Sequence, residues 1–183
     1  MNHQPFSGTR APSVLVNRVE EMARIQDAIY KPGSGLRIVL LEGPGGLGKT
    51  RMTREVLWRA GHPNERKERG APPAQQDWSG LGDAIISNLI DFVDLRLHTF
   101  DRFLNAIRNA LIWNSAADFP RYDAARAYHQ RMQAAQADFP TLRDAGQRAE
   151  QAFFEDYREI AAKRRVVWVL DTAEQLRFLA SQQ

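Results

Sequence analysis

The stretch of sequence that decides the fold is Gly43-Pro44-Gly45-Gly46-Leu47-Gly48-Lys49-Thr50. It fits the pattern Gly-x-x-x-x-Gly-Lys-Ser/Thr without departure. Glycines let backbone N–H groups turn toward a phosphate chain, and a helix that starts near Gly48 directs its positive end to the same place. We expect Lys49 to contact the β- and γ-phosphates and Thr50 to place its hydroxyl on Mg²⁺. The stretch therefore predicts a site for nucleotide phosphates.

The residues on either side of this loop have the patterns of a strand and a helix. Residues 36–41 read Leu-Arg-Ile-Val-Leu-Leu, a short apolar run between glycines and prolines that is typical of a buried parallel strand. Residues 49–60 favour a helix that Gly61 ends. A strand before the loop and a helix after it are the context that this phosphate-binding motif requires.

The rest of the chain alternates between helical and strand patterns. A helix beginning at Val19 stops at Pro32-Gly33, and residues 83–92 contain a second strand, although its apolar residues also fit a helix. Further helices are predicted at residues 99–113, 122–137, 141–162 and 173–181, and a third strand at residues 166–170. This alternation predicts an α/β fold with a parallel sheet and right-handed crossovers.

The domain organisation follows from length and local composition. The chain of 183 residues is long enough for one domain with a hydrophobic core, which we expect over residues 14–183. Residues 1–13 lack periodicity and are interpreted as a flexible lead-in. Residues 61–80 combine prolines with a charged run and are predicted to form a loop, and residues 121–163 are predicted to form a helical insertion.

Composition places the chain among ordinary globular proteins. It is 43% hydrophobic and 26% charged, with a net charge of +3, an excess too small to be evidence of nucleic-acid binding. It has no cysteine, which excludes disulfides and thiolate metal sites. No run approaches the roughly 18 apolar residues of a membrane span, and no secretory signal is visible. These features predict a cytoplasmic protein that does not contact membranes.

An acidic residue near Mg²⁺ is also needed if the loop serves phosphoryl chemistry. Asp171 follows the apolar run of the third predicted strand, at the end where ligands bind in open α/β sheets, and we expect it to hold Mg²⁺ through water. Asp171 is also well suited to cap the helix that follows. Glu174 is a candidate for orienting the attacking water, or a first-turn helix residue. Asp91 and Asp94, after the second strand, are weaker alternatives.

Three stretches together resemble the signal-transduction ATPases with numerous domains, the STAND NTPases, which are relatives of the AAA+ proteins: Val16-Asn17-Arg18-Val19-Glu20-Glu21-Met22, the loop that continues to Arg51, and Val166-Val167-Trp168-Val169-Leu170-Asp171. The resemblance implies ATP as the nucleotide, with Val16 and Arg18 framing the adenine and Arg51 beside the phosphate loop. Asn17 stands where the family usually has glycine. The family's second acidic residue directly after the strand is absent here, which implies slow hydrolysis.

The resemblance also implies a three-layer α-β-α P-loop NTPase fold with more core strands than this sequence supplies. The chain is therefore interpreted as the front part of a nucleotide-binding module, truncated after the third strand. Its expected partners are ATP, ADP and the other domains or subunits of a larger signalling protein, in which ATP holds one conformation and hydrolysis releases it.

Two other functions fit the same motif. A small-molecule P-loop kinase would need a lid carrying arginines, and the segment between residues 122 and 162 has several, at spacings that also suit solvated helix faces. Alternatively, the chain binds a nucleotide without hydrolysing it, and the missing strands leave an open sheet edge.

Overall fold

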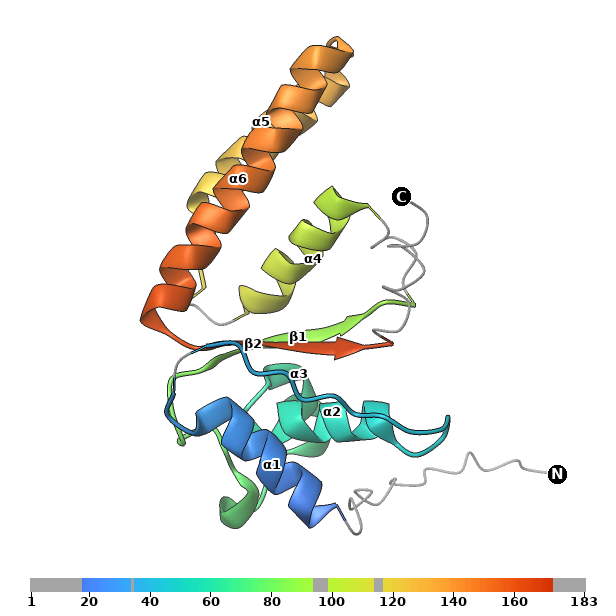
Figure 1. Cartoon of the computed structure of the whole chain (residues 1–183), viewed down its shortest axis with the longest axis vertical. Helices are drawn as coiled ribbons and strands as arrows, with labels where there is room; N and C mark the ends of the chain where they lie inside the picture. Colours follow the sequence, from blue (N-terminus) through green and yellow to red (C-terminus); the bar gives the residue numbers. More distant parts are fainter. Residues whose placement is uncertain (1–17, 34, 94–98, 114–116, 173–183) are drawn as a thin grey trace, which may run out of the picture. The chain divides into compact units, whose positions relative to one another are not determined.

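The computed structural model describes residues 18–33, 35–93, 99–113 and 117–172 (Figure 1). The chain forms two compact units, one ending at Trp78 and the other beginning at Ser79. It mixes helices with a small parallel sheet and is therefore broadly α/β, as predicted. No helix within the described ranges has the length and apolar character that crossing a membrane requires.

The first unit is helical. It contains α1 (Val19–Tyr30), α2 (Lys49–Arg59), α3 (Pro63–Arg69) and a 3-10 helix, η1 (Ala74–Gln76). The predicted helices at α1 and α2 are confirmed, and each buries one apolar face. The Tyr30 and Trp78 rings meet edge to face, with centroids 6.4 Å apart.

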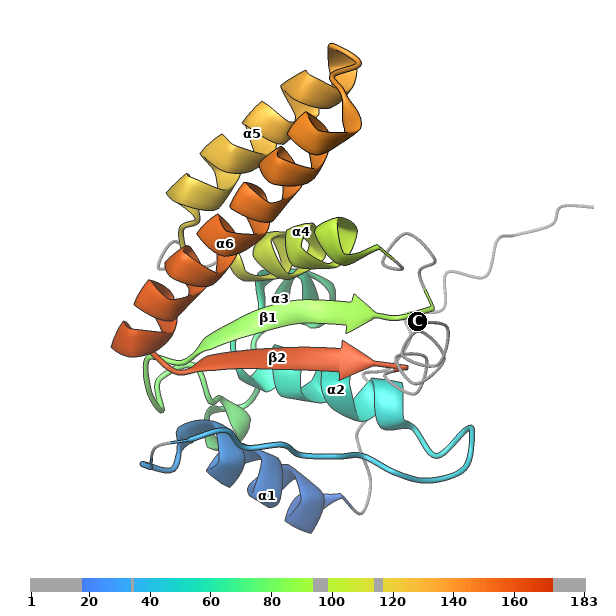
Figure 2. The same ribbon diagram turned by 45° about the horizontal axis from the view of Figure 1, so that its top comes forward.

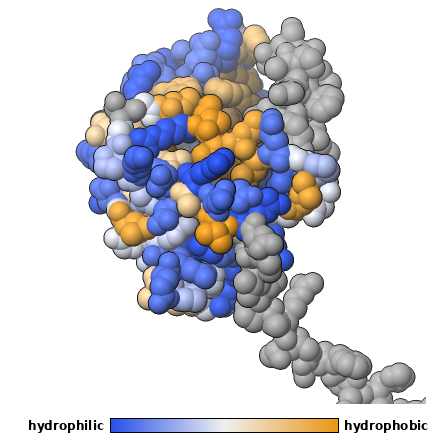
Figure 3. All heavy atoms as spheres, turned by 60° about the horizontal axis from the view of Figure 1, so that its bottom comes forward, coloured by the Kyte–Doolittle hydropathy of each residue, from blue (hydrophilic) through white to orange (hydrophobic). Residues whose placement is uncertain are grey.

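Residues 36–41 do not form the predicted strand. They carry no strand hydrogen bonding, and Leu36 and Ile38 are 89% and 78% exposed. Figure 3 likewise shows apolar side chains at the surface, among polar ones, on the face that it presents. The guanidinium of Arg37 instead donates hydrogen bonds to carbonyl oxygens at the end of α1, those of Asp27, Ala28, Lys31 and Pro32. An apolar run becomes a strand only beside a partner strand, and no described segment pairs with this one.

Residues 61–80 are also not the simple loop that the sequence predicted, because α3 and η1 lie within them. Pro63 occupies the first turn of α3, where its missing N–H costs nothing. The indole of Trp58 donates a 2.7 Å hydrogen bond to the Gly70 carbonyl and lies 3.9 Å from the Arg69 guanidinium. The buried Glu55 carboxylate accepts from Arg69 at 2.6 Å, so contacts with α2 hold the charged helix in place.

The second unit is the sheet with its helices (Figure 2). It contains β1 (Ile85–Asp91), α4 (Phe100–Leu111), α5 (Pro120–Ala134), α6 (Phe139–Lys163) and β2 (Val166–Asp171). β1 and β2 pair in parallel, from Ile85 opposite Val166 to Asp91 opposite Asp171. The predicted strands, their parallel pairing and the predicted helices between them are confirmed. The helix predicted at residues 173–181 lies outside the described residues.

The core of this unit is formed mainly by buried apolar residues of β1, α4, α5 and α6. α4 packs against β1, and α5 and α6 form a helical hairpin (Figure 1). The Phe153 ring stacks on Phe119 and meets Tyr122 edge to face, with centroids 5.3 Å away in both cases. All three rings are fully or almost fully buried, so this aromatic cluster ties the hairpin to the rest of the unit.

A buried serine bridges an irregularity in the sheet. The register shifts between Ile86 and Leu89, and Ser87 lies within the shift with no exposed surface. Its hydroxyl donates to the Asn88 carbonyl at 2.7 Å and accepts from the Val169 N–H at 2.9 Å. The side chain thus supplies a ladder bond that the bulge interrupts.

We expect Ser87→Ala to lower the free energy of unfolding by about 1–3 kcal/mol, because the buried Val169 N–H loses its acceptor. Urea unfolding followed by circular dichroism would measure the change. Ser87→Thr, which keeps the hydroxyl, should recover part of the loss. An unchanged midpoint for Ser87→Ala would show that another group accepts this hydrogen bond.

Candidate nucleotide-phosphate site

The loop predicted to bind phosphates is open and leads directly into α2. Gly48, the residue before the helix, has a φ of 80°, in the left-handed region where a side chain is strained. Cβ atoms added at Gly45, Gly46 or Gly48 would meet nothing within 4 Å, whereas one at Gly43 would lie 2.8 Å from Leu47 Cδ1. The backbone can therefore be approached closely, which a phosphate chain requires.

The side chain of Lys49 links the start of α2 to the start of the loop. Its ammonium donates to the carbonyl oxygens of Gly43 at 2.7 Å and Pro44 at 3.1 Å. An ammonium has three N–H donors, so one is left for an anion at the mouth of the loop. Lys49 is also the first residue of α2, where the positive end of the helix dipole lies. The first turn of α2 contains no acidic residue that would repel an anion.

The other predicted residues of the loop are brought together with Lys49. Thr50 and Arg51 follow it in the first turn of α2, and both are exposed. Pro44 and Leu47 are also exposed, on the loop itself. All the predicted residues between Gly43 and Arg51 thus lie on one accessible turn in the first unit.

The predicted adenine-framing residues are only partly described. Arg18 precedes α1, and its guanidinium donates a 2.7 Å hydrogen bond to the carboxylate of Glu21. That bond lowers the pKa of Glu21 below its ordinary value. Val16 lies outside the described residues. The described contact of Arg18 is therefore with its own helix.

The second unit brings two carboxylates to one end of its sheet. Asp171 ends β2 and is opposite Asp91, the last residue of β1. The Thr172 N–H donates to Asp171 Oδ1 at 3.0 Å, and the Thr172 hydroxyl donates to Asp91 Oδ1 at 3.1 Å. Asp91, predicted from the sequence as a weaker alternative to Glu174, is thus opposite Asp171 on the neighbouring strand. Its position at the end of a predicted parallel strand was the signal that could have raised its rank.

Glu174 and Asp94, the other acidic candidates, lie outside the described residues. Among the described residues, no group of three or more His, Asp or Glu side chains is arranged to hold a metal ion. The loop belongs to the first unit and the Asp91–Asp171 pair to the second.

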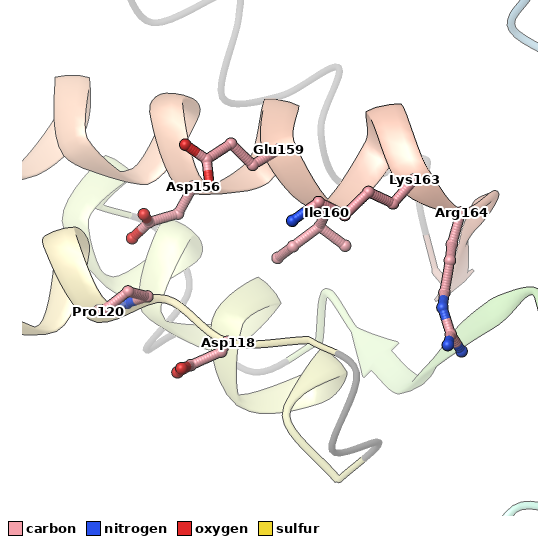
Figure 4. A pocket seen from close by; sticks show the side chains of 7 residues that line it. All are labelled: Asp118, Pro120, Asp156, Glu159, Ile160, Lys163 and Arg164. Atoms are coloured by element: carbon pink, nitrogen blue, oxygen red, sulfur yellow. The ribbon is translucent and has the colours of Figure 1, made fainter.

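A cavity of about 220 Å³ lies at the base of the α5–α6 hairpin (Figure 4). It is lined by Asp118, Pro120, Asp156, Glu159, Ile160, Lys163 and Arg164. None of these is a predicted site residue. Its buried carboxylate, Asp156, accepts from the Tyr122 N–H and from Arg121, both at 2.9 Å, so it joins α5 to α6.

Comparison with known proteins identifies no family for this chain. The chain matches no family model, no curated protein and no solved structure.

Proposed function

We propose that this chain binds Mg-ATP and hydrolyses it slowly, as the nucleotide switch of a larger signalling ATPase. The observation that carries the proposal is loop 43–50, which combines accessible backbone at its glycines, the ammonium of Lys49 and the start of α2. Each of these features favours a multiply charged anion. A phosphate chain can accept hydrogen bonds from all of these donors at once.

Thr50 and Asp171 are the residues proposed to hold the metal that accompanies ATP. The Thr50 hydroxyl, in the first turn of α2, and the Asp171 carboxylate, at the end of β2, would each be a ligand of Mg²⁺, and Lys49 would contact the β- and γ-phosphates. The metal would neutralise charge on the phosphate oxygens. Val16 and Arg18 would frame the adenine, with the Arg18 guanidinium oriented by its bond to Glu21.

Slow turnover follows from the residue after Asp171. Thr172 occupies that position and has no basic group with which to activate water. Glu174 is the proposed residue for orienting the attacking water. A module of this kind binds nucleotide more readily than it hydrolyses it, so its bound state persists long enough to regulate other domains or subunits. We place it in the cytoplasm, where ATP is abundant.

The fold is proposed to be of the three-layer α-β-α type found in P-loop NTPases. The support is the parallel pair β1–β2, together with the apolar residues 36–41 that directly precede the loop. Exposed apolar side chains such as Leu36 and Ile38 need a covering layer, which a strand position in an extended sheet would provide.

Calorimetric titration of the purified chain with ATP, ADP and AMP, with and without Mg²⁺, tests this function. We expect ATP and ADP to bind and AMP to bind far more weakly, because the loop recognises the outer phosphates. Mg²⁺ should strengthen ATP binding. Equal affinity for AMP and ATP, or no binding by a chain that circular dichroism shows to be folded, would contradict the proposal.

A further inference from the structure

Strand β2 has an edge that pairs with no other strand among the described residues. The sheet formed by these residues has two strands, and β1 lies along one edge of β2 (Figure 2). The other edge of such a strand presents a row of backbone N–H and C=O groups that can pair with another chain. The hydrogen bonds toward β1 show which residues contribute to that row.

The bonds between the two strands fix the direction of each backbone group in β2. The Arg165 carbonyl accepts from the Ile85 N–H at 2.8 Å, and the Val169 N–H donates to the Ser87 hydroxyl at 2.9 Å. Odd-numbered residues of β2 therefore direct their backbone groups to β1. Because this direction alternates along a strand, the even-numbered residues direct theirs to the open edge. These residues are Val166, Trp168 and Leu170.

Charges are separated by sign along β2. Lys163, Arg164 and Arg165 come directly before the strand, and Asp171 is its last residue. A second β2 in parallel would place like charges beside each other, whereas an antiparallel one would place its acidic end beside the basic start of the first. Opposite charges in cross-strand pairs stabilise a sheet, and like charges destabilise it. The charges therefore favour an antiparallel copy, which is the arrangement that two-fold symmetry generates.

We propose that a second copy of this chain pairs antiparallel with the open edge of β2, which joins two two-stranded sheets into one of four strands. A two-fold axis at Trp168 gives the register in which all three outward residues of both copies are paired. Trp168 is then opposite its own equivalent, and Val166 is opposite Leu170 of the partner subunit. The same register places Arg165 opposite Asp171 of the partner subunit, and symmetry repeats that pair.

The side chain at the centre of this interface suits such a contact. Trp168 is 38% exposed, and its indole meets the Tyr157 ring edge to face, with centroids 5.5 Å apart. In the dimer the two indoles would cover each other, and aromatic cross-strand pairs stabilise sheets. A sheet of two strands is marginal by itself, whereas four strands are common. The inference goes beyond the proposed function and does not depend on nucleotide binding.

The first test uses the absence of cysteine from the chain, because one introduced thiol then reports which residues meet. Trp168→Cys places a thiol of each copy at the two-fold axis, with Cα atoms about 5.5 Å apart, which is within the range of a disulfide. We expect mild oxidation to convert most of this variant to a covalent dimer on a non-reducing gel. Gln147→Cys, exposed on α6, is the control and should stay mostly monomeric.

The second test is sedimentation equilibrium without nucleotide, at about 1–100 μM, the range in which weak interfaces associate. We expect the wild-type mass to approach that of two chains as concentration rises. Arg165→Asp should weaken the dimer about tenfold, because it places like charges opposite each other twice. Adding Asp171→Arg to it restores opposite charges and should recover most of the loss.

Three outcomes would overturn the proposal. The first is a folded wild type that stays monomeric up to the highest concentration. The second is a dimer that Arg165→Asp leaves as stable as wild type, or that the double variant does not recover. The third is equal disulfide formation by Trp168→Cys and Gln147→Cys, since the copies would then meet elsewhere or only by collision. Should Trp168→Cys not fold, the charge variants decide the matter without it.

Discussion

Lys49→Ala is expected to weaken Mg-ATP binding about 100-fold. A hydrogen bond from an ammonium to a charged acceptor contributes about 1.5–3 kcal/mol, and 2.8 kcal/mol corresponds to about 100-fold in affinity. The substitution also removes the bonds from Nζ to the Gly43 and Pro44 carbonyls, which link the start of the loop to the start of α2. Calorimetric titration with ATP in saturating Mg²⁺ would measure the loss.

A lysine elsewhere in the same unit provides the control. Lys67 on α3 is exposed and carries the same charge, so Lys67→Ala should bind Mg-ATP as wild type does. Lys49→Arg keeps the charge but replaces a compact ammonium with a wider guanidinium, and we expect affinity between those of wild type and Lys49→Ala. Binding by a folded Lys49→Ala within about twofold of wild type would show that the phosphates lie elsewhere.

The elements predicted correctly from the sequence are those whose signals are local. Residues 166–170 are a continuous apolar run, and the structure forms β2 there, ending at Asp171. The apolar residues of β1 also fitted a helix, and pairing with β2 decides in favour of a strand. In α4, apolar residues recur at helical spacing, and Leu104, Ile107 and Leu111 are buried as that spacing predicts.

The wrong predictions concern segments whose structure depends on distant contacts. Residues 36–41 have the composition of a strand, but a strand also needs a neighbour with free backbone groups, which composition does not reveal. The sequence of α3 is almost entirely charged and gives no apolar periodicity. Its helix depends on Glu55 and Trp58 of α2, which contact Arg69 and Gly70.

The candidate site also has a part that local sequence predicts and a part that depends on distant contacts. Loop 43–50 is predictable because its donors come from consecutive residues, so the motif itself fixes their arrangement. The contact between Asp91 and Thr172 spans 81 positions of the chain and depends on the register of β1 against β2. A one-residue shift of that register would separate the two, and the register cannot be predicted from two short apolar runs that are 81 positions apart.

Asp156→Ala is expected to lower the free energy of unfolding by about 2–3 kcal/mol. The residue is only 2% exposed, and its carboxylate accepts hydrogen bonds from the Tyr122 N–H and the Arg121 guanidinium. Without it, a buried backbone N–H on α5 has no acceptor, and an unsatisfied buried group costs about 1–3 kcal/mol. Loss of the ion pair adds less than for a fully buried pair, because Arg121 is about half exposed. Urea unfolding would measure the change.

An exposed aspartate on the same helix, Asp144, provides a control that distinguishes the effect of burial from the effect of charge on stability. Asp144 pairs with Arg148 one turn away, with both side chains well exposed, and such pairs contribute little to stability. Asp144→Ala should therefore leave the urea midpoint nearly unchanged. Asp156→Asn keeps an acceptor for the Tyr122 N–H and should lose less stability than Asp156→Ala. Equal midpoints for Asp156→Ala and Asp144→Ala would mean that the buried carboxylate does not hold α5 to α6, and that the aromatic cluster around Phe153 alone does.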